Sequence, residues 1–323
     1  MNKSGTIFVY LNGGLGNQLF QFATAYQIAG KSRNVVLIEN AGGARRVSSG
    51  ELEISYAIGS QFFHTRPIGK HKRLLSRICN FLLRAGIAVE KSKIGNRLLD
   101  VASILARFPL GLILGFNVKV VVCRGHGNYR KRNGHRKGNL LIIGYFQSRN
   151  NVMASRTFIL NALENRHGEK IIIPRSTLQN KDVCPLAIHV RRGDYFLESK
   201  IGCLSDSYYL EAYKQAKKKI WFNEVWIFTE EEADITELKL NINDFPLKIF
   251  TKKDYDTPTT LLLMSSCKGI IMSNSTFSWW SAFVSENSTK QSRYWPDPWF
   301  RDLRQPLNLL DDMGSGVGSI WLN

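Results

Sequence analysis

Short runs of β-branched residues alternate with helical segments along most of the chain, and this alternation is the strongest constraint on its fold. Amphipathic helical spacing recurs over 18–30 and 208–220, between such runs. This pattern predicts parallel sheets covered by helices, so the expected fold class is α/β. The predicted strands are Ile7–Leu11, Val35–Glu39, Leu140–Phe146, Ile171–Ile173, Leu186–Val190, Val225–Thr229, Leu247–Phe250 and Gly269–Asn274.

The length of the chain points to two domains. A single hydrophobic core stops growing at about 250–300 residues, and this chain has 323. Polar residues follow the strand predicted to end at Phe146, so we expect the boundary within 148–185. We place an N-terminal domain at 1–155 and a C-terminal domain at 156–323.

Positive charge is concentrated in one segment. The chain has 44 Lys and Arg against 26 Asp and Glu, a net charge of +18, which favours an anionic partner such as phosphate. Residues 66–137, an insertion in the first domain, hold 17 of these cations but only Glu90 and Asp100 as acids. Two interpretations stay open: a helical insertion with a solvated basic face, or a surface for an anionic membrane.

Simple counts exclude several classes of protein. Five cysteines without C-x-x-C spacing indicate neither a disulfide framework nor a zinc ribbon, and they suit a reducing cytoplasm. No signal peptide is expected, and the longest apolar stretch, 110–116, falls short of the ~20 residues of a spanning helix. We therefore expect a cytoplasmic protein, peripheral at most on the inner membrane face.

A glycine-rich turn joins the first predicted strand to a helix. Gly13, Gly14 and Gly16 lie in this turn, and Asn17 and Gln18 follow at the helix start. Strand, glycine turn and helix start form an anion-binding geometry, although a tight turn that needs positive φ at glycine explains the same residues. The two amides favour a polyhydroxylated ligand.

Two arginines follow the strand predicted at 186–190. Ligands of open α/β sheets bind beyond the carboxyl ends of the strands, and guanidinium groups pair with phosphate. Because neighbouring side chains on a strand point to opposite faces, His189 and Arg191 are expected to share one face. Arg192 is then expected to pair with an acid such as Asp194. A structural Arg–Asp pair without a ligand is the alternative.

A third polar group follows the strand predicted to end at Asn274. Ser275 or Thr276 is a natural N-cap of the next helix. Backbone N–H groups and hydroxyls at such a helix start can hold a phosphate, although capping alone explains them too. Trp279 and Trp280 are expected to anchor this helix in the core.

Carboxylates lie at two further places of interest. Glu230 and Glu231 follow the strand predicted at 225–229, where they can hold a ribose or a guanine edge, or simply begin a solvated helix. The D-x-D sequence at 254–256 resembles a metal motif, but we expect a structural loop there. The helix after it is expected to start with Thr257 as N-cap and Pro258 as first residue.

Four motifs lie along the chain, at 13–23 (GGLGNQLFQFA), 144–148 (GYFQS), 189–195 (HVRRGDY) and 273–280 (SNSTFSWW). Their residues and their order resemble the α-1,2-fucosyltransferases of glycosyltransferase family 11. No resemblance covers the basic segment or the tail after Trp299. The choice of acceptor is expected to differ there.

This resemblance implies a GT-B-like fold, with two Rossmann-like domains and a cleft between them. The N-terminal domain would face the acceptor, and the C-terminal domain would bind the GDP-sugar. The implied reaction transfers L-fucose from GDP-L-fucose to O2 of a galactose residue with inversion. The expected acceptor is a bacterial surface polysaccharide or O-antigen unit of lipopolysaccharide, carried on a lipid diphosphate.

The resemblance also implies roles for individual residues. Arg191 would bind the diphosphate, with His189 near the guanosine and Ser275 or Thr276 on a phosphate. Asn17 would lie near the sugar, with Gly14, Gly16 and Gln18 beside it, and Asn274 near the donor. Glu230 and Glu231 are carried over from an acidic pair of related fucosyltransferases.

The chemistry sets two further requirements. We expect no metal cofactor, so Arg191 must neutralise the charge that builds on the leaving GDP. The acceptor hydroxyl gives its proton to a base, for which Asp194 and Glu198 are both candidates.

Rival functions follow from the charge. A nucleic-acid-binding protein would suit the basic residues Arg130, Lys131 and Arg132, but no nucleic-acid motif or interleaved aromatic residue accompanies them, so we expect no nucleic acid as partner. A glycan-binding relative without activity and a transferase that uses another GDP-sugar, such as GDP-mannose, stay open.

Overall fold

The structure is a computed structural model that describes residues 5–30, 32–66, 71–89, 92–127, 138–171, 183–231, 242, 244–285 and 291–322. Two compact units share the chain, and each has its own sheet. Unit 1 comprises Met1–Ser155 and Pro306–Asp311, and unit 2 comprises Arg156–Gln305 and Asp312–Asn323. The predicted α/β class with two Rossmann-like sheets is confirmed.

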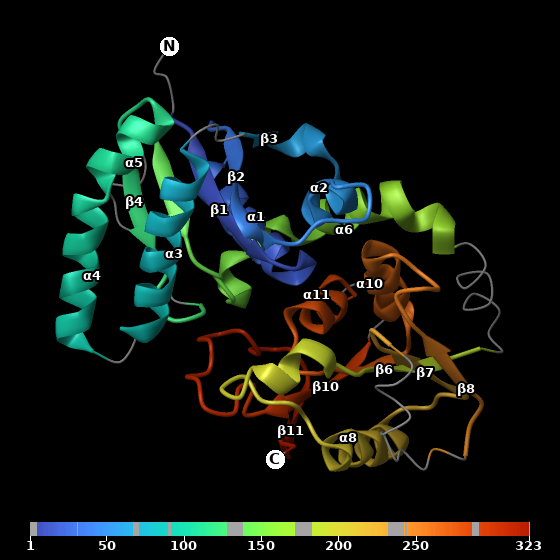
Figure 1. Cartoon of the computed structure of the whole chain (residues 1–323). Helices are drawn as coiled ribbons and strands as arrows, with labels where there is room; N and C mark the ends of the chain where they lie inside the picture. Colours follow the sequence, from blue (N-terminus) through green and yellow to red (C-terminus); the bar gives the residue numbers. More distant parts are fainter. Residues whose placement is uncertain are drawn as a thin grey trace. The chain divides into compact units, whose positions relative to one another are not determined.

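Unit 1 contains five parallel strands in the order β3-β2-β1-β5-β4 (Figure 1). The central strand β1 is covered on both faces, because Ile7 to Leu11 form a continuous buried run. The chain steps from β1 to β2 on one side, and β5 lies on the other side of β1. The strands are β1 (Ile7–Gly13), β2 (Val35–Ala44), β3 (His64–Thr65), β4 (Lys119–Val122) and β5 (Leu140–Ile143).

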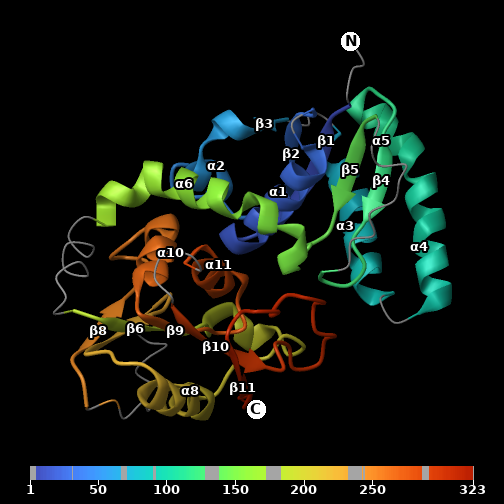
Figure 2. The ribbon, with the colours of Figure 1, turned by 180° about the vertical axis from the view of Figure 1, so that it is seen from behind.

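Helices cover both faces of this sheet (Figures 1 and 2). One face packs on α1 (Leu15–Ala29), with α2 (Glu53–Ile58) beside it. The other face, with Phe8 and Tyr10, packs on α3 (Lys72–Ala88), α4 (Lys93–Leu105) and α5 (Arg107–Leu114). The described part of the basic segment is therefore largely helical. Arg130, Lys131 and Arg132 lie outside the described residues.

Unit 2 contains six parallel strands in the order β11-β10-β9-β6-β7-β8. In Figures 1 and 2, α8 lies below this sheet, and α10 and α11 lie above it. Helix α6 packs on α10 and α11. The elements are α6 (Arg156–His167), β6 (Pro185–His189), α8 (Asp206–Lys219), β7 (Glu224–Phe228), β8 (Leu247–Phe250), α10 (Thr257–Ser266), β9 (Gly269–Ile271), α11 (Thr276–Val284), β10 (Ser292–Asp297) and β11 (Ser315–Gly318).

Short 3₁₀ turns connect several of these elements. They are η1 (Ser60–Phe62), η3 (Arg149–Asn151) and η4 (Met153–Ser155) in unit 1, and η5 (Gly168–Ile171) and η6 (Gly193–Leu197) in unit 2. Of the strand predicted at 171–173, Ile171 ends η5, and the other two residues lie outside the described residues.

Strands β3, β4, β10 and β11 do not follow from the sequence pattern. Three of them carry a weak signal: β3 has two residues, Pro296 interrupts β10, and β11 holds two glycines in four residues. β4 (KVVV) is rich in β-branched residues and was missed. The helix start predicted at Thr257 is wrong by one residue. Asp256 is the N-cap of α10, and its carboxylate accepts a hydrogen bond from the Thr259 N–H at 2.9 Å.

No helix among the described residues is both long enough and apolar enough to cross a membrane.

A buried arginine fastens α6 to the end of α11. Arg156 donates from Nε to the Phe283 carbonyl at 2.7 Å and from Nη2 to the Val284 carbonyl at 2.9 Å. Its guanidinium also lies 5.7 Å from the centre of the Phe283 ring. A cation at the carboxyl end of a helix satisfies carbonyls that have no partner within the helix.

We expect Arg156→Ala to lower the free energy of unfolding of unit 2 by about 2–4 kcal/mol, because it leaves buried carbonyls without a hydrogen-bond donor and creates a cavity. Urea unfolding followed by tryptophan fluorescence measures this, since all seven tryptophans lie in unit 2. The exposed Arg304 is the matched control, and Arg304→Ala should change stability by less than about 0.5 kcal/mol. Equal losses in both variants would contradict the assigned role.

Candidate functional site

Two sequence motifs meet at the carboxyl edge of the second sheet. β6 and β9 are neighbours, but the chain leaves β6 toward β7 and β8 and leaves β9 toward β10 and β11. Such a reversal is the point where open α/β sheets bind ligands. His189 ends β6, and its Nδ1 lies 2.7 Å from Oγ of Ser273, just after β9. The motifs at 189–195 and 273–280 therefore share one edge.

His189 is buried and uncharged. Its ring lies 5.5 Å from the Phe277 ring, and its exposed fraction is 4%. Burial, and then the positive charge of Arg191, lowers the pKa of His189 to about 3. At neutral pH this imidazole can exchange hydrogen bonds but carries no charge.

Arg191 lies between two carboxylates. Its Nη1 donates to Glu230, and its Nη2 donates to Asp194 at 2.9 Å. The Nε atom is buried and has no hydrogen-bond partner among the described residues. Burial alone lowers the pKa of this guanidinium, but the nearby Glu230, Tyr195 and Asp194 outweigh it and raise the pKa. Arg191 is therefore a fixed cation with one unused donor.

The predicted pair between Arg192 and Asp194 is wrong. Arg192 is buried and donates to Asp206, the first residue of α8, while Asp194 pairs with Arg191. The strand ends at His189, and the chain then turns into η6 with φ of +33° at Gly193. The alternation expected of a strand does not continue through this turn, so both arginines find other partners.

The start of α11 lies beside His189. Ser275 is the N-cap, and its Oγ accepts the Phe277 N–H at 3.3 Å, with Thr276 as the first helical residue. Asn274 donates from Nδ2 to the Gly202 carbonyl at 2.9 Å, and its Oδ1 is buried without a hydrogen-bond partner among the described residues. Trp279 and Trp280 are fully buried, which confirms their predicted place in the core.

The other predicted carboxylates divide into two groups. Glu230 joins the Arg191 cluster, whereas Glu231 pairs with Lys252 at 2.9 Å on the surface. Glu198 follows η6, is exposed, and has no ion-pair partner among the described residues. Only one of the two predicted ribose ligands thus lies near Arg191.

The D-x-D segment has structural contacts. Asp254 accepts hydrogen bonds from the backbone N–H of Thr251 at 2.7 Å and from its hydroxyl at 3.0 Å. Asp256 caps α10 and pairs with Lys170 at 2.5 Å. Within the described ranges, no three His, Cys, Asp or Glu residues gather as a metal site requires.

The glycine-rich turn forms the carboxyl edge of the first sheet. Gly13 has φ of +80°, and a Cβ there would lie 2.5 Å from Nδ2 of Asn17, so this position requires glycine. Gly14 is the N-cap of α1, and Gly16 is buried in its first turn. Asn17 accepts a hydrogen bond from Nε2 of Gln147 at 3.0 Å. The motifs at 13–23 and 144–148 therefore also meet at one edge.

Gln18 is a structural residue in this edge. Its amide nitrogen donates to the carbonyls of Gly13 at 2.9 Å and Arg45 at 3.0 Å, and its oxygen accepts the Ile54 N–H at 3.0 Å. The side chain is fully buried. It holds the turn in place and is not available to a ligand, in contrast to the prediction.

A network of amides and hydroxyls extends along the same edge and was not predicted. Nδ2 of Asn12 donates to the Tyr145 hydroxyl at 3.0 Å, and Nδ2 of Asn40 donates to Oδ1 of Asn12 and of Asn80, each at 3.1 Å. Asn12 directly follows the first predicted strand and Asn40 directly follows the second, which was the signal available. Asn80 comes from α3, and nothing in the sequence relates it to the other two.

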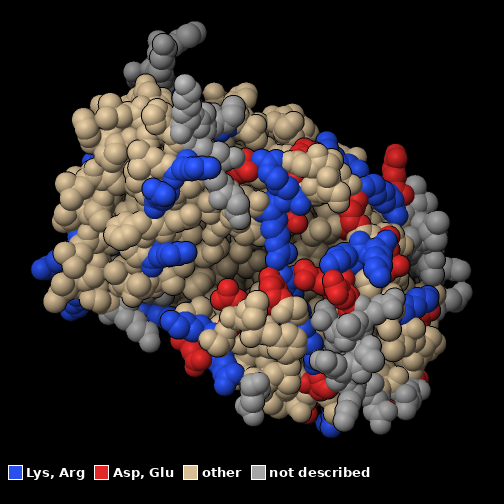
Figure 3. All heavy atoms as spheres, viewed as in Figure 1, with Lys and Arg blue, Asp and Glu red and all other residues tan. Residues whose placement is uncertain are grey.

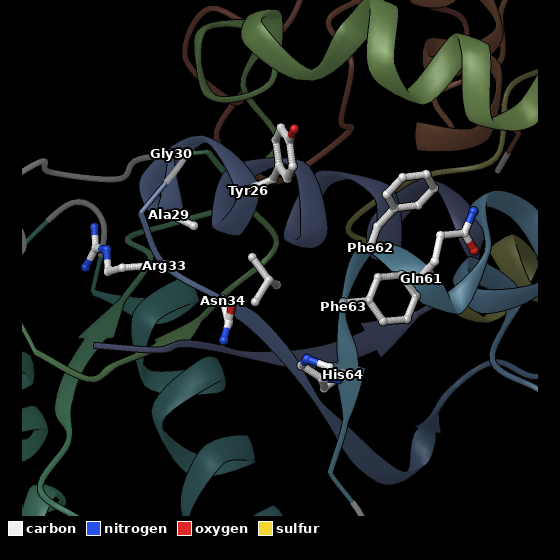
Figure 4. A pocket seen from close by; sticks show the side chains of 10 residues that line it. Tyr26, Ala29, Gly30, Arg33, Asn34, Gln61, Phe62, Phe63 and His64 are labelled. Atoms are coloured by element: carbon white, nitrogen blue, oxygen red, sulfur yellow. The ribbon is translucent and has the colours of Figure 1, made fainter. Parts of the chain in front are cut away.

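A small pocket lies at the other edge of the first sheet (Figure 4). Its volume is about 140 Å³, and its lining includes Arg33, Asn34, Phe62 and His64. These residues precede β2 or belong to η1 and β3, so the pocket is separate from the glycine-rich turn.

Comparisons with known proteins relate the chain to a family of glycosyl transferases. The family model described as Glycosyl transferase family 11 matches residues 128–297, slightly more than half of the chain. An α-1,2-colitosyltransferase of Escherichia coli is 26% identical over 329 residues, covering 93% of this chain and 94% of that protein. The O-antigen biosynthesis glycosyltransferase WbnK of Escherichia coli is 26% identical over 293 residues, covering 85% and 89%.

Among solved structures, POFUT1 in complex with GDP is similar over 91% of this chain and 99% of that one. The TM-score is 0.47 and the sequence identity is 13%.

The buried His189 makes the stability of unit 2 depend on pH. The unfolded chain binds a proton at the histidine below about pH 6.5, whereas the folded chain does so only near pH 3. The contribution of the neutral His189 to the unfolding free energy is therefore fully present above pH 6.5 and is lost as the pH falls below that value. Between pH 7 and pH 5 we expect His189 to account for about 2 kcal/mol of lost unfolding free energy.

Urea unfolding by tryptophan fluorescence at pH 5, 7 and 8 tests this, with His189→Asn beside the unaltered chain. The variant should lose less stability on acidification, and its difference at pH 8 gives the baseline cost of the substitution. Parallel pH curves for the two proteins would show that His189 is not buried in its neutral form.

Proposed function

Because the chain belongs to glycosyl transferase family 11, we propose that it is an inverting α-1,2-fucosyltransferase that moves L-fucose from GDP-L-fucose to O2 of a galactose residue. The acceptor we propose is an O-antigen or other surface polysaccharide unit linked to a lipid diphosphate at the inner membrane face. The names of the two Escherichia coli relatives support the linkage and the setting. The observation that carries the proposal is the unused donor of Arg191.

Arg191 is suited to hold the diphosphate of the donor. An anionic oxygen at its buried Nε would satisfy a donor that otherwise has no partner. The diphosphate also competes with Glu230 and Asp194 for the two Nη groups, because guanidinium pairs bidentately with phosphate. Donor binding then replaces carboxylates with a diphosphate around a cation that stays charged.

The elements beside Arg191 complete the donor site. We assign Ser275 and Thr276, at the start of α11, to the phosphates, since this helix end is favourable for an anion. The neutral His189 and Oδ1 of Asn274, which has no hydrogen-bond partner among the described residues, are suited to a nucleoside, which offers hydrogen bonds but no charge. Glu230 can accept ribose hydroxyls once the diphosphate has released it from Arg191.

The proposed reaction needs a cation and a base. The bond between C1 of the sugar and the β-phosphate oxygen breaks, and its electron pair leaves with GDP. The acceptor O2 attacks C1 from the opposite face and loses its proton. Arg191 stabilises the charge that builds on GDP in this step.

Glu198 is the better candidate for the base. Asp194 already accepts a hydrogen bond of 2.9 Å from the Arg191 guanidinium, so this contact would have to break before its carboxylate could reach an acceptor hydroxyl. Glu198 is exposed and without an ion-pair partner among the described residues, so its carboxylate can approach a hydroxyl.

We assign the acceptor sugar to the edge of unit 1. Gly14 lies partly exposed at the start of α1, Asn17 presents an amide there, and the buried Gly16 lets the first turn pack closely beneath them. Amides and hydroxyls recognise sugar hydroxyls without favouring an anion. Gln18 supports this edge from below through its three hydrogen bonds.

One comparison supports a second candidate for the donor sugar, colitose. The colitosyltransferase relative acts, by its name, with colitose, which is L-fucose without the 3-hydroxyl. A site that hydrogen-bonds this hydroxyl rejects the sugar that lacks it, whereas a site without such a partner accepts both.

We expect Arg191→Ala to reduce acceptor-dependent release of GDP about 10²–10³-fold, since it removes a preorganised cation from the leaving group. The assay uses GDP-L-fucose and galactose-terminated acceptors, with and without EDTA, and wild-type activity should survive EDTA. Full activity in the variant, or activity that requires added metal, would contradict the proposal.

Arg192 is the matched control for this substitution. Arg192→Ala breaks a buried ion pair with Asp206 and should lower the unfolding free energy of unit 2 by roughly 2–4 kcal/mol. Arg191→Ala should cost less stability, because its partners Asp194 and Glu230 keep 46% and 36% of their side chains exposed to water. The two variants therefore distinguish Arg192, which stabilises the folded unit, from Arg191, which acts on the donor.

The donor is identified by comparing GDP-L-fucose, GDP-colitose and GDP-mannose under the same assay. We expect kcat/KM to be highest for GDP-L-fucose and at least about 100-fold lower for GDP-mannose, whose hydroxyls point differently. A higher value for GDP-colitose would assign the chain to colitosyl transfer and leave the roles of Arg191 and Glu198 intact.

A further inference from the structure

The basic segment presents an apolar stripe to the solvent. On α4, the side chains of Ile94, Leu98, Val101 and Leu105 are 52–73% exposed. Their spacing of four, three and four residues places them on one helical face. The opposite face of α4 is already used, because Leu99 is buried against the first sheet. The outer stripe therefore has no role in the core of unit 1.

The same feature continues onto the neighbouring helices. Phe108 and Leu112 on α5 are 75% and 68% exposed, whereas Leu110 and Leu114 of that helix are buried. Phe81 on α3 is 65% exposed. Both neighbours pack on α4, so these residues extend one surface. Soluble domains seldom leave so many large apolar side chains together in water.

The helices that carry this stripe hold many more cations than acids. Asp100 is the one acid among the described residues of 71–127, and Arg124 binds it with two hydrogen bonds of 2.9 and 3.0 Å. In Figure 3 the face over α3 and α4, at the left, is mainly tan with separate blue side chains and no red ones. Six exposed cations of α3 to α5 have no ion-pair partner among the described residues: Arg73, Arg77, Arg84, Lys93, Arg97 and Arg107.

We propose that the outer face of α3, α4 and α5 binds the surface of an anionic lipid bilayer. A bilayer interface offers both chemistries that this surface needs, since apolar side chains enter the boundary of the acyl chains while cations meet lipid phosphates. The proposal does not rest on the transferase reaction. No helix among the described residues spans a membrane, so this contact is peripheral.

Other occupants fit the surface less well. A second copy of the chain would bring two cationic faces together, and they repel each other. Nucleic acid would pair with the cations but would leave the aliphatic stripe in water, because bases stack on aromatic rings and not on leucine or isoleucine. An anionic bilayer can contact both the aliphatic side chains and the cations of this surface.

Co-sedimentation with vesicles tests the proposal on the full chain. Vesicles of phosphatidylcholine with 30% phosphatidylglycerol should bind the protein, and pure phosphatidylcholine should bind it at least about tenfold more weakly. Binding to the anionic vesicles should fall as salt rises from 50 to 500 mM. Equal binding to both vesicles, or no binding to either, would overturn the proposal.

Matched variants locate the surface. Leu98→Ser, Leu105→Ser and Phe108→Ser combined should weaken vesicle binding at least about tenfold, since each removes buried apolar area at the interface. The control combines Trp221→Ser, Leu247→Ser and Leu307→Ser, which are exposed apolar residues elsewhere. The control should bind as the unaltered chain does, and an equal loss in both variants would refute the assignment.

A second pair of variants tests whether vesicle binding depends on the charge of this surface or on the total charge of the chain. Arg77→Gln, Arg84→Gln and Arg97→Gln should weaken binding, while Lys214→Gln, Lys218→Gln and Arg304→Gln remove the same charge from unit 2 and should have little effect. Both sets should keep turnover of a soluble acceptor, so failure here is distinct from failure of the proposed function. Sedimentation without lipid completes the test: a dimer that the serine variant abolishes would assign the surface to a second copy.

Discussion

The reversal of strand order between β6 and β9 is the constraint on which the proposed donor site depends. The chain leaves these two neighbours in opposite directions, so their following loops separate and the carboxyl edge stays open. The contact between His189 and Ser273 closes the base of that opening. Arg191 and Asn274 follow those two residues in sequence, which fixes both at the same edge. In the first sheet, the glycine-rich turn after β1 meets Gln147, which follows the neighbouring strand β5.

Burial of a charge explains the cluster around Arg191. A guanidinium with only 13% of its side chain exposed needs anionic partners, because the loss of water is costly. Asp194 from η6 and Glu230 from the end of β7 supply them. These acids keep the cation charged in the free protein, and a diphosphate can take over the same function. In the proposed function, the same cluster is stable without a ligand and favours a strongly anionic one.

Strand ends predicted well which motifs lie at one edge of a sheet, and predicted side-chain partners poorly. Parallel strands place their carboxyl ends at one edge, so the positions of His189 and Ser275 followed from the sequence alone. The partner of Arg192 did not follow, because Asp206 arrives from the start of α8, and only the tertiary fold brings it near. Gln18 was misjudged for a related reason. An amide at a helix start looks the same in sequence whether it faces a ligand or the carbonyls of Gly13 and Arg45.

The weakest predictions concerned short or interrupted elements. β11 holds two glycines in four residues, and its place in the sheet depends on pairing with β10 and on the buried Val317. Neither a propensity nor a period marks such a strand. The helices of the basic segment were expected, but the two faces of α4 were not distinguished, since inner and outer apolar residues overlap in the sequence.

Three surfaces of the chain differ in chemistry, and the difference argues for a division of labour. The edge of unit 2 is charged, with Arg191 between carboxylates, which suits a diphosphate. The edge of unit 1 is neutral and rich in amides, as Asn12, Asn17 and Asn40 show, which suits sugar hydroxyls. The outer face of α3 to α5 combines aliphatic residues with unpaired cations, which suits neither. A glycan carried on a lipid diphosphate is both a sugar and an amphiphile, so a transferase that extends it gains from holding the bilayer and the sugar on separate surfaces of the same unit.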